Sequence, residues 1–273
     1  MPQHPTAKAR VLSIAGSDSG GGAGIQADIK TITALHGYAT TAITALTAQN
    51  TVGVQGILPV PPDFIRSQIR SVLDDIGTDA IKTGMLGGSD EIAVVAEEIT
   101  RAKMARPDLP IVIDPVMVAK GGAVLLKAEA LEALRRLLLP QASVITPNLP
   151  EAEYLTGMVL ADVADMRAAA RYLHEATGAS VLLKGGHLPG DDLVDVLMDE
   201  HGLHDFPTTR LPGRHTHGTG CTLASALATR LAQGIPLHDA VAQARQYVRN
   251  AIIHAPGLGR GAGPLWHAVD PTA

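Results

Sequence analysis

Short apolar runs and longer helical stretches alternate along almost the whole of this chain. The short runs are rich in valine and isoleucine, and the longer stretches are rich in alanine and leucine. Such runs are typical of buried strands and amphipathic helices. The predicted strands are residues 11–16, 40–47, 54–60, 79–83, 111–113, 143–146 and 181–183. Strands that alternate with helices favour a mainly parallel sheet with helices on both faces, so we expect an α/β protein.

The helices and one hairpin complete this outline. Helices are predicted at residues 23–36, 63–73, 220–233 and 236–254, and Ser89 is placed to cap another. Residues 193–199 and 203–208 are predicted to pair as a hairpin that turns near His201. The sequence shows no linker, low-complexity segment or repeat, so we expect one domain over residues 1–273, with irregular tails at 1–9 and 257–273.

Composition excludes several classes of function. The 273-residue chain has a formal net charge of −5 and only 3% aromatic residues, so it lacks the basic surface and stacking side chains of nucleic-acid binders. No apolar run approaches the roughly 20 residues that span a bilayer, and the polar N-terminus lacks a signal-peptide core. A single cysteine excludes an intrachain disulfide and fits a reducing compartment. We expect a cytoplasmic protein that binds neither nucleic acid nor membrane.

Polar residues stand at the ends of six predicted strands. Ligands of open parallel sheets bind beyond the carboxyl ends of the strands, so polar groups gathered there predict a binding site. These residues are Asp18, Gln49, Lys82, Asp114, Asn148 and Lys184. A solvated loop explains any one of them alone, but the whole set on one rim favours a site.

A glycine-rich turn precedes the single cysteine. Gly218, Thr219, Gly220 and Cys221 stand directly before an alanine-rich helical pattern, which places them at a helix start. Unpaired backbone N–H groups and the positive end of the helix dipole make such a turn an anion site. The same dipole favours a thiolate, so the pKa of Cys221 is predicted to be lowered. A buried cysteine that only packs as a small apolar residue is the alternative.

Two further features suit phosphate chemistry. Asn148 and Glu151 lie three residues apart at a predicted helix start, on the same side of its first turn. Their oxygens suit Mg²⁺, although such a pair is also typical of ordinary helix capping. Lys184 ends a strand, where its ammonium either reaches a phosphate or lies on the surface.

Three other types of site are disfavoured. Gly22, Gly24 and Ala27 meet a loose dinucleotide fingerprint, but the next strand carries no acidic residue to hold a ribose. A P-loop is also disfavoured, because no glycine stands directly before a Lys-Thr pair. His215 and His217 could begin a zinc site, but no cluster of carboxylates or cysteines completes it.

Eight segments together resemble one family. They lie between residues 15 and 222, and they occur in the same order as the corresponding segments of that family. The segments are residues 15–18, 24–28, 44–51, 82–86, 114–117, 146–153, 184–187 and 216–222. From about residue 11 to residue 252, the chain resembles the hydroxymethylpyrimidine/phosphomethylpyrimidine kinases of thiamine biosynthesis, which belong to the ribokinase-like superfamily.

That resemblance implies a three-layer α/β/α fold and an ATP-dependent, Mg²⁺-dependent kinase that forms a homodimer. One γ-phosphoryl group would pass to the hydroxymethyl oxygen of 4-amino-5-hydroxymethyl-2-methylpyrimidine, and a second to the resulting monophosphate. The pyrimidine site would comprise Gly16, Asp28, Gln49, Met85 and Val116. Within it, Gln49 would hydrogen-bond the aminopyrimidine edge, while Met85 and Val116 would enclose the ring.

The resemblance also implies a phosphate side of the site. Its residues would be Asp114, Asn148, Glu151, Lys184, Gly218, Thr219, Gly220 and Cys221. The first three would order Mg²⁺ and its waters, and Lys184, Asp114 and Thr219 would contact ATP. The amides of the glycine turn would hold the transferring group. Cys221 would stand beside the attacking hydroxyl as a positioning group and base.

Two rival functions are left by the same residues. A pyridoxal or pyridoxine kinase has the same fold, although Gln49, Asn50 and residues 82–86 favour the pyrimidine. A non-catalytic pyrimidine-binding protein needs no Mg²⁺ site, so the presence of Asn148 and Glu151 argues against it. Residues 52–62 are a candidate flap, and residues 257–267 are a candidate to reach the nucleotide.

Overall fold

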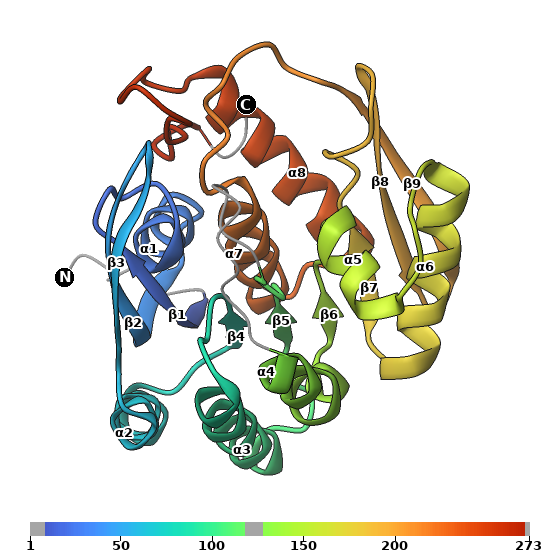
Figure 1. Cartoon of the computed structure of the whole chain (residues 1–273). Helices are drawn as coiled ribbons and strands as arrows, with labels where there is room; N and C mark the ends of the chain where they lie inside the picture. The colour runs from blue at the N-terminus through green and yellow to red at the C-terminus, as the bar shows by residue number, and fades with distance from the viewer. Residues whose placement is uncertain (1–8, 118–127, 271–273) are drawn as a thin grey trace, which may run out of the picture.

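A computed structural model of the chain describes residues 9–117 and 128–270. The strands of these residues form one nine-stranded sheet, in the order β3-β2-β1-β4-β5-β6-β7-β8-β9 (Figure 1). Six neighbouring strands pair in parallel, which confirms the α/β class. They are β2 (Tyr38–Asn50), β1 (Arg10–Asp18), β4 (Ala80–Thr83), β5 (Ile111–Ile113), β6 (Val144–Ile145) and β7 (Ser180–Leu183).

Both edges of the sheet are antiparallel. At one edge, β3 (Gly53–Pro59) folds back on β2. At the other edge, β8 (Asp192–Asp199) and β9 (Gly202–Thr209) form the predicted hairpin. Strand β2 continues past its predicted end because its last residues pair with β3. The resulting ribbon carries Gln49 beyond the parallel part of the sheet.

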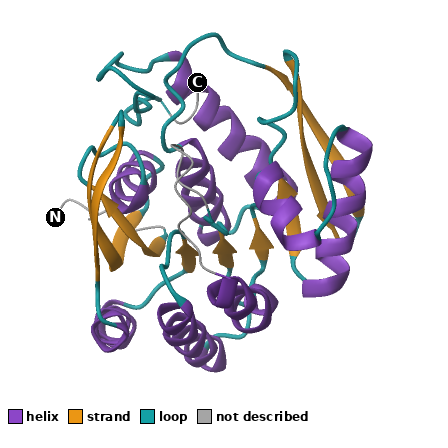
Figure 2. Cartoon of the chain, viewed as in Figure 1, coloured by secondary structure: helices purple, strands orange, loops and turns teal. Residues whose placement is uncertain are grey.

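Two layers of helices enclose the sheet (Figure 2), as the resemblance implied. One face is covered by α1 (Gly24–Ala34), α7 (Thr219–Ala232) and α8 (Leu237–Ile253). The opposite face is covered by α2 (Pro62–Ser71), α3 (Ser89–Ala105), α4 (Ala128–Ala133), α5 (Leu149–Thr156) and α6 (Val163–Thr177). Within residues 9–117 and 128–270, every helix is too short or too polar to cross a bilayer.

The parallel strands are apolar on both faces, which explains their continuous apolar runs. In β1, Val11 packs under α1 and α7, while Leu12 points to the core on the other face. In β7, Leu182 and Leu183 divide between the two cores in the same way. Most polar residues therefore stand at the ends of these strands, and exceptions such as Ser13 and Lys82 are buried.

The predicted irregular tails lie partly outside the described residues, at 1–8 and 271–273. Residues 256–270 form no helix or strand, but several contacts anchor them. The Trp266 amide donates to the Ala251 carbonyl, and the Tyr247 hydroxyl donates to the His267 carbonyl at 2.7 Å. Leu265 and His267 are buried. The C-terminal segment is therefore part of the folded structure.

Candidate active site

A cavity of about 1110 Å³ lies at the carboxyl ends of the parallel strands. It runs from the β2–β3 ribbon at one end to the β8–β9 hairpin at the other. Every residue predicted for the site except Asp28 and Lys82 lines it. These residues are Gly16, Gln49, Met85, Asp114, Val116, Asn148, Glu151, Lys184, Gly218, Thr219, Gly220 and Cys221. The fold thus gathers segments that are more than two hundred positions apart, such as those of Gly16 and Cys221.

The first turn of α7 forms an anion-binding cradle in the middle of this cavity. Its N-cap, Gly218, has a φ of 82°, and a Cβ there would overlap the carbonyl of Gly22. No side chain caps the helix, and the Thr219 amide reaches the Thr216 carbonyl only at 3.5 Å. The first amides of a helix lack internal acceptors, so those of residues 219–221 are available to an anion.

Lys184 lies beside this cradle. Its Nζ is 2.9 Å from Asp114 Oδ1 and 4.0 Å from Glu151 Oε2. A Cβ on Gly220 would lie 3.2 Å from the same Nζ, so glycine at 220 leaves room for the ammonium. Burial acts to lower the pKa of Lys184, but the nearby carboxylates raise it above its ordinary value. The cradle therefore has a fixed positive charge next to it.

Asn148 and Glu151 form a reciprocal capping box at the start of α5. Asn148 Oδ1 accepts the Glu151 amide at 2.9 Å, and Glu151 Oε2 accepts the Asn148 amide at 2.8 Å. The capping role that the sequence left open is therefore present. Because the Asn148 oxygen is already engaged, the carboxylates of Glu151 and Asp114 are the stronger candidates for a metal ligand.

These two carboxylates fit Mg²⁺ when a phosphate completes the ligand set. Burial raises the pKa of Glu151 to about 7. The neighbouring groups therefore offset the negative charge of its carboxylate only in part, and a bound cation would offset the rest. Asp114 Oδ1 accepts hydrogen bonds from Thr146 and Lys184. In the described part of the chain, no three His, Cys, Asp or Glu side chains lie close enough to hold a metal alone. Mg²⁺ is usually held by one or two carboxylates with water and substrate phosphates, which suits this arrangement.

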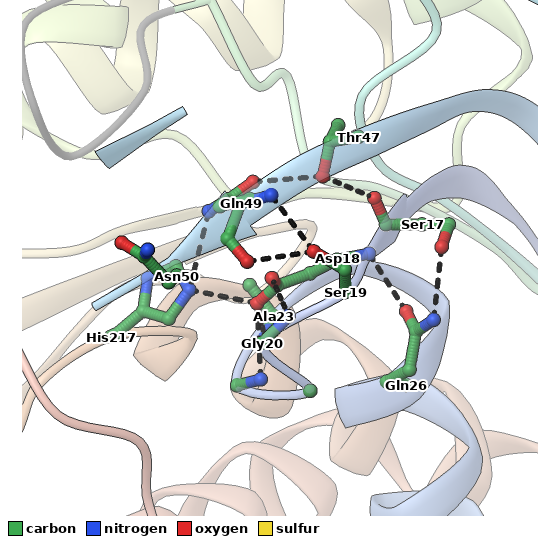
Figure 3. A network of polar contacts seen from close by, with 12 residues as sticks. Ser17, Asp18, Ser19, Gly20, Ala23, Gln26, Thr47, Gln49, Asn50 and His217 are labelled. Carbon is green, nitrogen blue, oxygen red and sulfur yellow. Dashed lines mark hydrogen bonds and ion pairs between the residues drawn. The ribbon is translucent and has the colours of Figure 1, made fainter. Parts of the chain in front are cut away.

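A polar network around Asp18 joins the glycine loop, residues 19–23 between β1 and α1, to the cradle (Figure 3). Asp18 Oδ2 accepts the amides of Gly22 and Ala23, and it lies 2.9 Å from His217 Nε2. Burial acts to raise the pKa of Asp18, but the His217 and amide hydrogen bonds lower it below its ordinary value. The carboxylate therefore holds the glycine loop against the residue that precedes Gly218.

Gln49 extends the same network into the cavity (Figure 3). One terminal atom of the Gln49 amide lies 3.3 Å from His217 Nε2, and the other lies 3.2 Å from the Thr47 hydroxyl oxygen. A ring nitrogen that donates to Asp18 cannot also accept from an amide, so we assign the amide oxygen of Gln49 to the His217 side, which leaves its NH2 group to donate to the Thr47 hydroxyl oxygen. One donor and one acceptor of the amide then stay available for a ligand.

Met85 and Gly16 form an apolar surface near this network. The Gly16 amide donates to the Met85 carbonyl at 3.1 Å, and the Thr44 hydroxyl donates to the same carbonyl at 2.6 Å. A Cβ on Gly16 would overlap the Met85 side chain, so glycine lets the thioether lie directly on the backbone. Val116 lines the cavity as well. This end of the cavity thus offers apolar contacts beside the amide of Gln49.

Two predicted residues lie beneath the cavity and not on its surface. Asp28 and Lys82 have exposed fractions of 0%, and Lys82 Nζ lies 2.9 and 3.0 Å from the two Asp28 oxygens. Ser13 and Ser225 donate to the same carboxylate. The prediction that Asp28 contacts the substrate is therefore wrong, because buried partners occupy both of its oxygens.

The electrostatic prediction for Cys221 is also wrong. Its side chain lines the cavity and is partly exposed, but burial raises the pKa of the thiol to about 11. Lys82 lowers this pKa, while Asp28 and Asp114 raise it. The cost of placing a thiolate in this environment therefore exceeds the benefit of the helix dipole. At neutral pH the group is a thiol.

The hairpin end of the cavity was missed from the sequence. Arg245 and Arg249 lie one turn apart on α8 and tie that helix to the hairpin. Arg245 Nε donates to Asp195 at 2.7 Å, and Arg249 donates to the Thr208 hydroxyl at 3.1 Å. In the sequence, only the four-residue spacing of Arg245 and Arg249 within a predicted helix could have indicated this end of the cavity. Apolar residues complete this end, namely Leu193, Pro207, Leu211, Leu223, Val248 and Ile252.

The C-terminal segment reaches the Gln49 end of the cavity and not the hairpin end (Figure 1). The His217 amide donates to the Gly263 carbonyl, and the Gly261 amide donates to the Thr51 hydroxyl at 3.3 Å. Arg214 donates to two carbonyls of the same segment. Residues 257–264 therefore hold the β2–β3 turn against the loop of His217.

Comparison with known proteins identifies the family. The family model described as phosphomethylpyrimidine kinase matches residues 18–266. The chain belongs to the phosphomethylpyrimidine kinase family. A hydroxymethylpyrimidine/phosphomethylpyrimidine kinase from Streptomyces coelicolor is 49% identical over 97% of both chains. The thiamine biosynthesis bifunctional protein ThiED of Geobacter sulfurreducens is 51% identical over 97% of this chain, which spans only 53% of that protein.

Solved structures place this family member in the expected fold. A pyridoxal kinase from Bacillus subtilis, solved as an ADP complex, superposes with a TM-score of 0.87 and 40% identity, covering 95% of this chain and 97% of the other. The ribokinase-like fold and the family expected from the eight sequence segments are both confirmed.

Proposed function

We propose that this chain phosphorylates 4-amino-5-hydroxymethyl-2-methylpyrimidine and then its monophosphate, with ATP as the donor, in thiamine biosynthesis. One observation carries the proposal: a single cavity holds an anion cradle between two different ends. The Gln49 end offers a donor, an acceptor and an apolar surface, which suit a neutral aminopyrimidine. The hairpin end would take the nucleotide, in a cavity of about 1110 Å³ in total. Membership of a family whose relatives are named for both phosphorylations supports the same reaction.

The cradle would act on the transferring phosphoryl group. A bond would form between the hydroxymethyl oxygen and the γ-phosphorus, while the bond from that phosphorus to the oxygen of ADP breaks. Charge on the equatorial oxygens would be stabilised by the amides of residues 219–221 and by Lys184. The protein therefore contributes alignment and fixed positive charge instead of a covalent intermediate.

Cys221 would orient the attacking hydroxyl group. Its pKa of about 11 means that it is protonated at neutral pH, so it does not begin the reaction as a base. A loose phosphoryl-transfer transition state demands little deprotonation of the nucleophile. The hydroxyl proton can leave late, to an oxygen of the transferred group.

We propose Asp114 and Glu151 as the residues that hold Mg²⁺ together with the nucleotide. When bound, Mg²⁺ would neutralise phosphate charge. Asn148 would position the Glu151 side chain through the capping box. Lys184 lies between the two carboxylates and would contact the phosphates from the protein side.

We also propose that the protein is a cytoplasmic homodimer. The single cysteine fits a reducing compartment. Leu46 and Leu58, which pair across the β2–β3 ribbon, are exposed apolar side chains that a second copy could cover. Light scattering of the purified protein should give twice the chain mass, and a monomer mass at micromolar concentration would contradict the dimer.

A product assay by mass tests the proposed reaction. The protein is incubated with the pyrimidine, ATP and Mg²⁺, and with pyridoxal in a matched reaction. We expect pyrimidine monophosphate first and diphosphate later, with a higher kcat/KM than for pyridoxal. Efficient turnover of pyridoxal alone would instead indicate the activity named for the Bacillus subtilis structure. Binding of the pyrimidine without ATP consumption would indicate a non-catalytic protein.

A further inference from the structure

A buried polar cluster that the proposed mechanism does not use lies beneath α7. Its members come from β1, α1, β4 and α7, and each has an exposed fraction of 0%. Asp28 is at its centre and accepts hydrogen bonds from the ammonium of Lys82 at 2.9 and 3.0 Å. Ser225 Oγ donates to Asp28 Oδ1 at 2.6 Å, and Ser13 Oγ donates to Oδ2 at 2.5 Å. Both carboxylate oxygens are therefore fully paired.

Such a cluster is not explained by stability alone. Burial of an ion pair carries a large desolvation cost, and well-packed apolar residues of similar volume are often as stable or more stable. The surrounding backbone is nevertheless fitted to the charge, since a Cβ on Gly84 would lie 3.0 Å from Lys82 Nζ. Burial acts to lower the pKa of Lys82, but the carboxylates of Asp28 and Asp114 raise it, so the ammonium stays charged.

The cluster is linked to the cradle through α7, which carries both Ser225 and Cys221. Ser225 is four residues after Cys221 on α7, so the two side chains lie on the same side of the helix. The charged groups that act on the thiol come from four different elements. Lys82 on β4 and Lys184 after β7 supply positive charge, whereas Asp28 on α1 and Asp114 after β5 supply negative charge.

We propose that Lys82 is a positioning residue for the phosphoryl transfer. Through Asp28 and Ser225 it anchors the first turns of α7, and its ammonium provides the buried positive charge beneath the Cys221 thiol. The positioning role of Lys82 in turnover rests on the proposed function. The electrostatic effect of Lys82 on the Cys221 thiol does not depend on that function.

Alkylation of Cys221 by iodoacetamide tests the electrostatic part directly, because the chain has no other cysteine. Rates are measured from pH 8 to pH 10, where they report the thiolate fraction. Lys82→Met removes the positive charge and should slow alkylation about tenfold, as a rise of one in the pKa would. Asp28→Asn leaves the lysine and removes a negative charge, so it should accelerate alkylation about tenfold. The double variant should return close to the wild-type rate.

Opposite signs distinguish this role from a purely structural one. Loosening of the fold would change alkylation in the same direction in both single variants, and that result, or no change in either, would overturn the proposal. Glu98→Gln is a matched control, because Glu98 is a buried carboxylate that pairs with Arg66, Arg70 and Arg101 on α2 and α3. It should lower stability without changing the alkylation rate. If Lys82→Met does not fold, two other variants still test the electrostatic role. Asp28→Asn should accelerate alkylation, and Ser225→Ala should not slow it.

Kinetics test the positioning part. Folded Lys82→Met should lose at least tenfold in kcat while KM for ATP changes less than threefold, because the cluster touches no substrate. An unchanged kcat would overturn the positioning role. If the wild-type protein itself shows no kinase activity, the proposed function fails, but the alkylation result still supports or overturns the electrostatic role.

Discussion

Replacement of Glu151 by glutamine should stabilise the ligand-free protein, and increasingly so at higher pH. The pKa of this carboxyl group is about 7 in the folded protein, against an ordinary value of 4.5, chiefly because of burial. The folded state therefore holds the proton more tightly than the unfolded state. Stability that is present at low pH is lost as the pH rises from the ordinary value through about 7.

The size of the effect follows from the two pKa values. Proton linkage gives a cost of about 1 kcal/mol at pH 5.5 and about 3 kcal/mol at pH 8.5 for a pKa raised from 4.5 to about 7. Glutamine keeps an oxygen that can accept the Asn148 amide, so the capping box should survive. The stability gap between Glu151→Gln and wild type should therefore widen by about 2 kcal/mol over this range.

Urea denaturation at the two pH values, followed by circular dichroism, measures that gap. A saturating mixture of Mg²⁺ and ADP is then added to both proteins. If Glu151 helps to hold the metal, the ligands should stabilise wild type more than the variant at pH 8.5 and so narrow the gap. A gap that is the same at both pH values would refute the reasoning about burial. Equal stabilisation of both proteins would refute the metal role alone.

Three other substitutions test the cradle. Cys221→Ala should lower kcat by about a hundredfold or more with intact folding, because the attacking hydroxyl loses its positioning group; near-normal steady-state turnover would remove that role. Lys184→Met should lower kcat about a hundredfold and weaken ATP binding measured by calorimetry. Gly218→Ala should destabilise the fold by at least about 1–3 kcal/mol in thermal melts, because its φ of 82° disfavours a side chain and Gly22 occupies the space; an unchanged melting temperature would contradict the geometry.

Much of the fold could be predicted because parallel strands are buried on both faces and therefore appear in the sequence as continuous apolar runs. The strands around residues 11–16, 79–83 and 181–183 were placed within a few residues. The extension of β2 to Asn50 was missed, since it depends on pairing with β3 and not on local preference. The course of the C-terminal segment was also missed. Its contacts with Thr51 and His217 join positions far apart in the chain, and no local pattern encodes them.

The composition of the cavity was predictable for a simple physical reason. A residue that follows a buried parallel strand must emerge at the carboxyl edge, so Asp114, Asn148 and Lys184 had to meet there. Lys82 failed this rule because it lies inside β4 and not after it. Its side chain therefore points into the protein, where Asp28 on α1 neutralises it. A shift of one or two residues along a strand decides between a ligand contact and a buried support.

The error in the Cys221 prediction shows which physical effect dominates at such a turn. A helix start favours a thiolate by a modest amount, typically about 0.3–1 kcal/mol, whereas removal of a thiolate from water costs several times more. The cradle is therefore suited to anions that bring their own counter-charge, as a metal-bound phosphate does. A protein anion fixed permanently in the same place would compete with that phosphate for the amides and for Lys184. A neutral thiol avoids this competition and still gives the hydroxyl group a hydrogen-bonding partner, which favours cysteine as an orienting residue in this site.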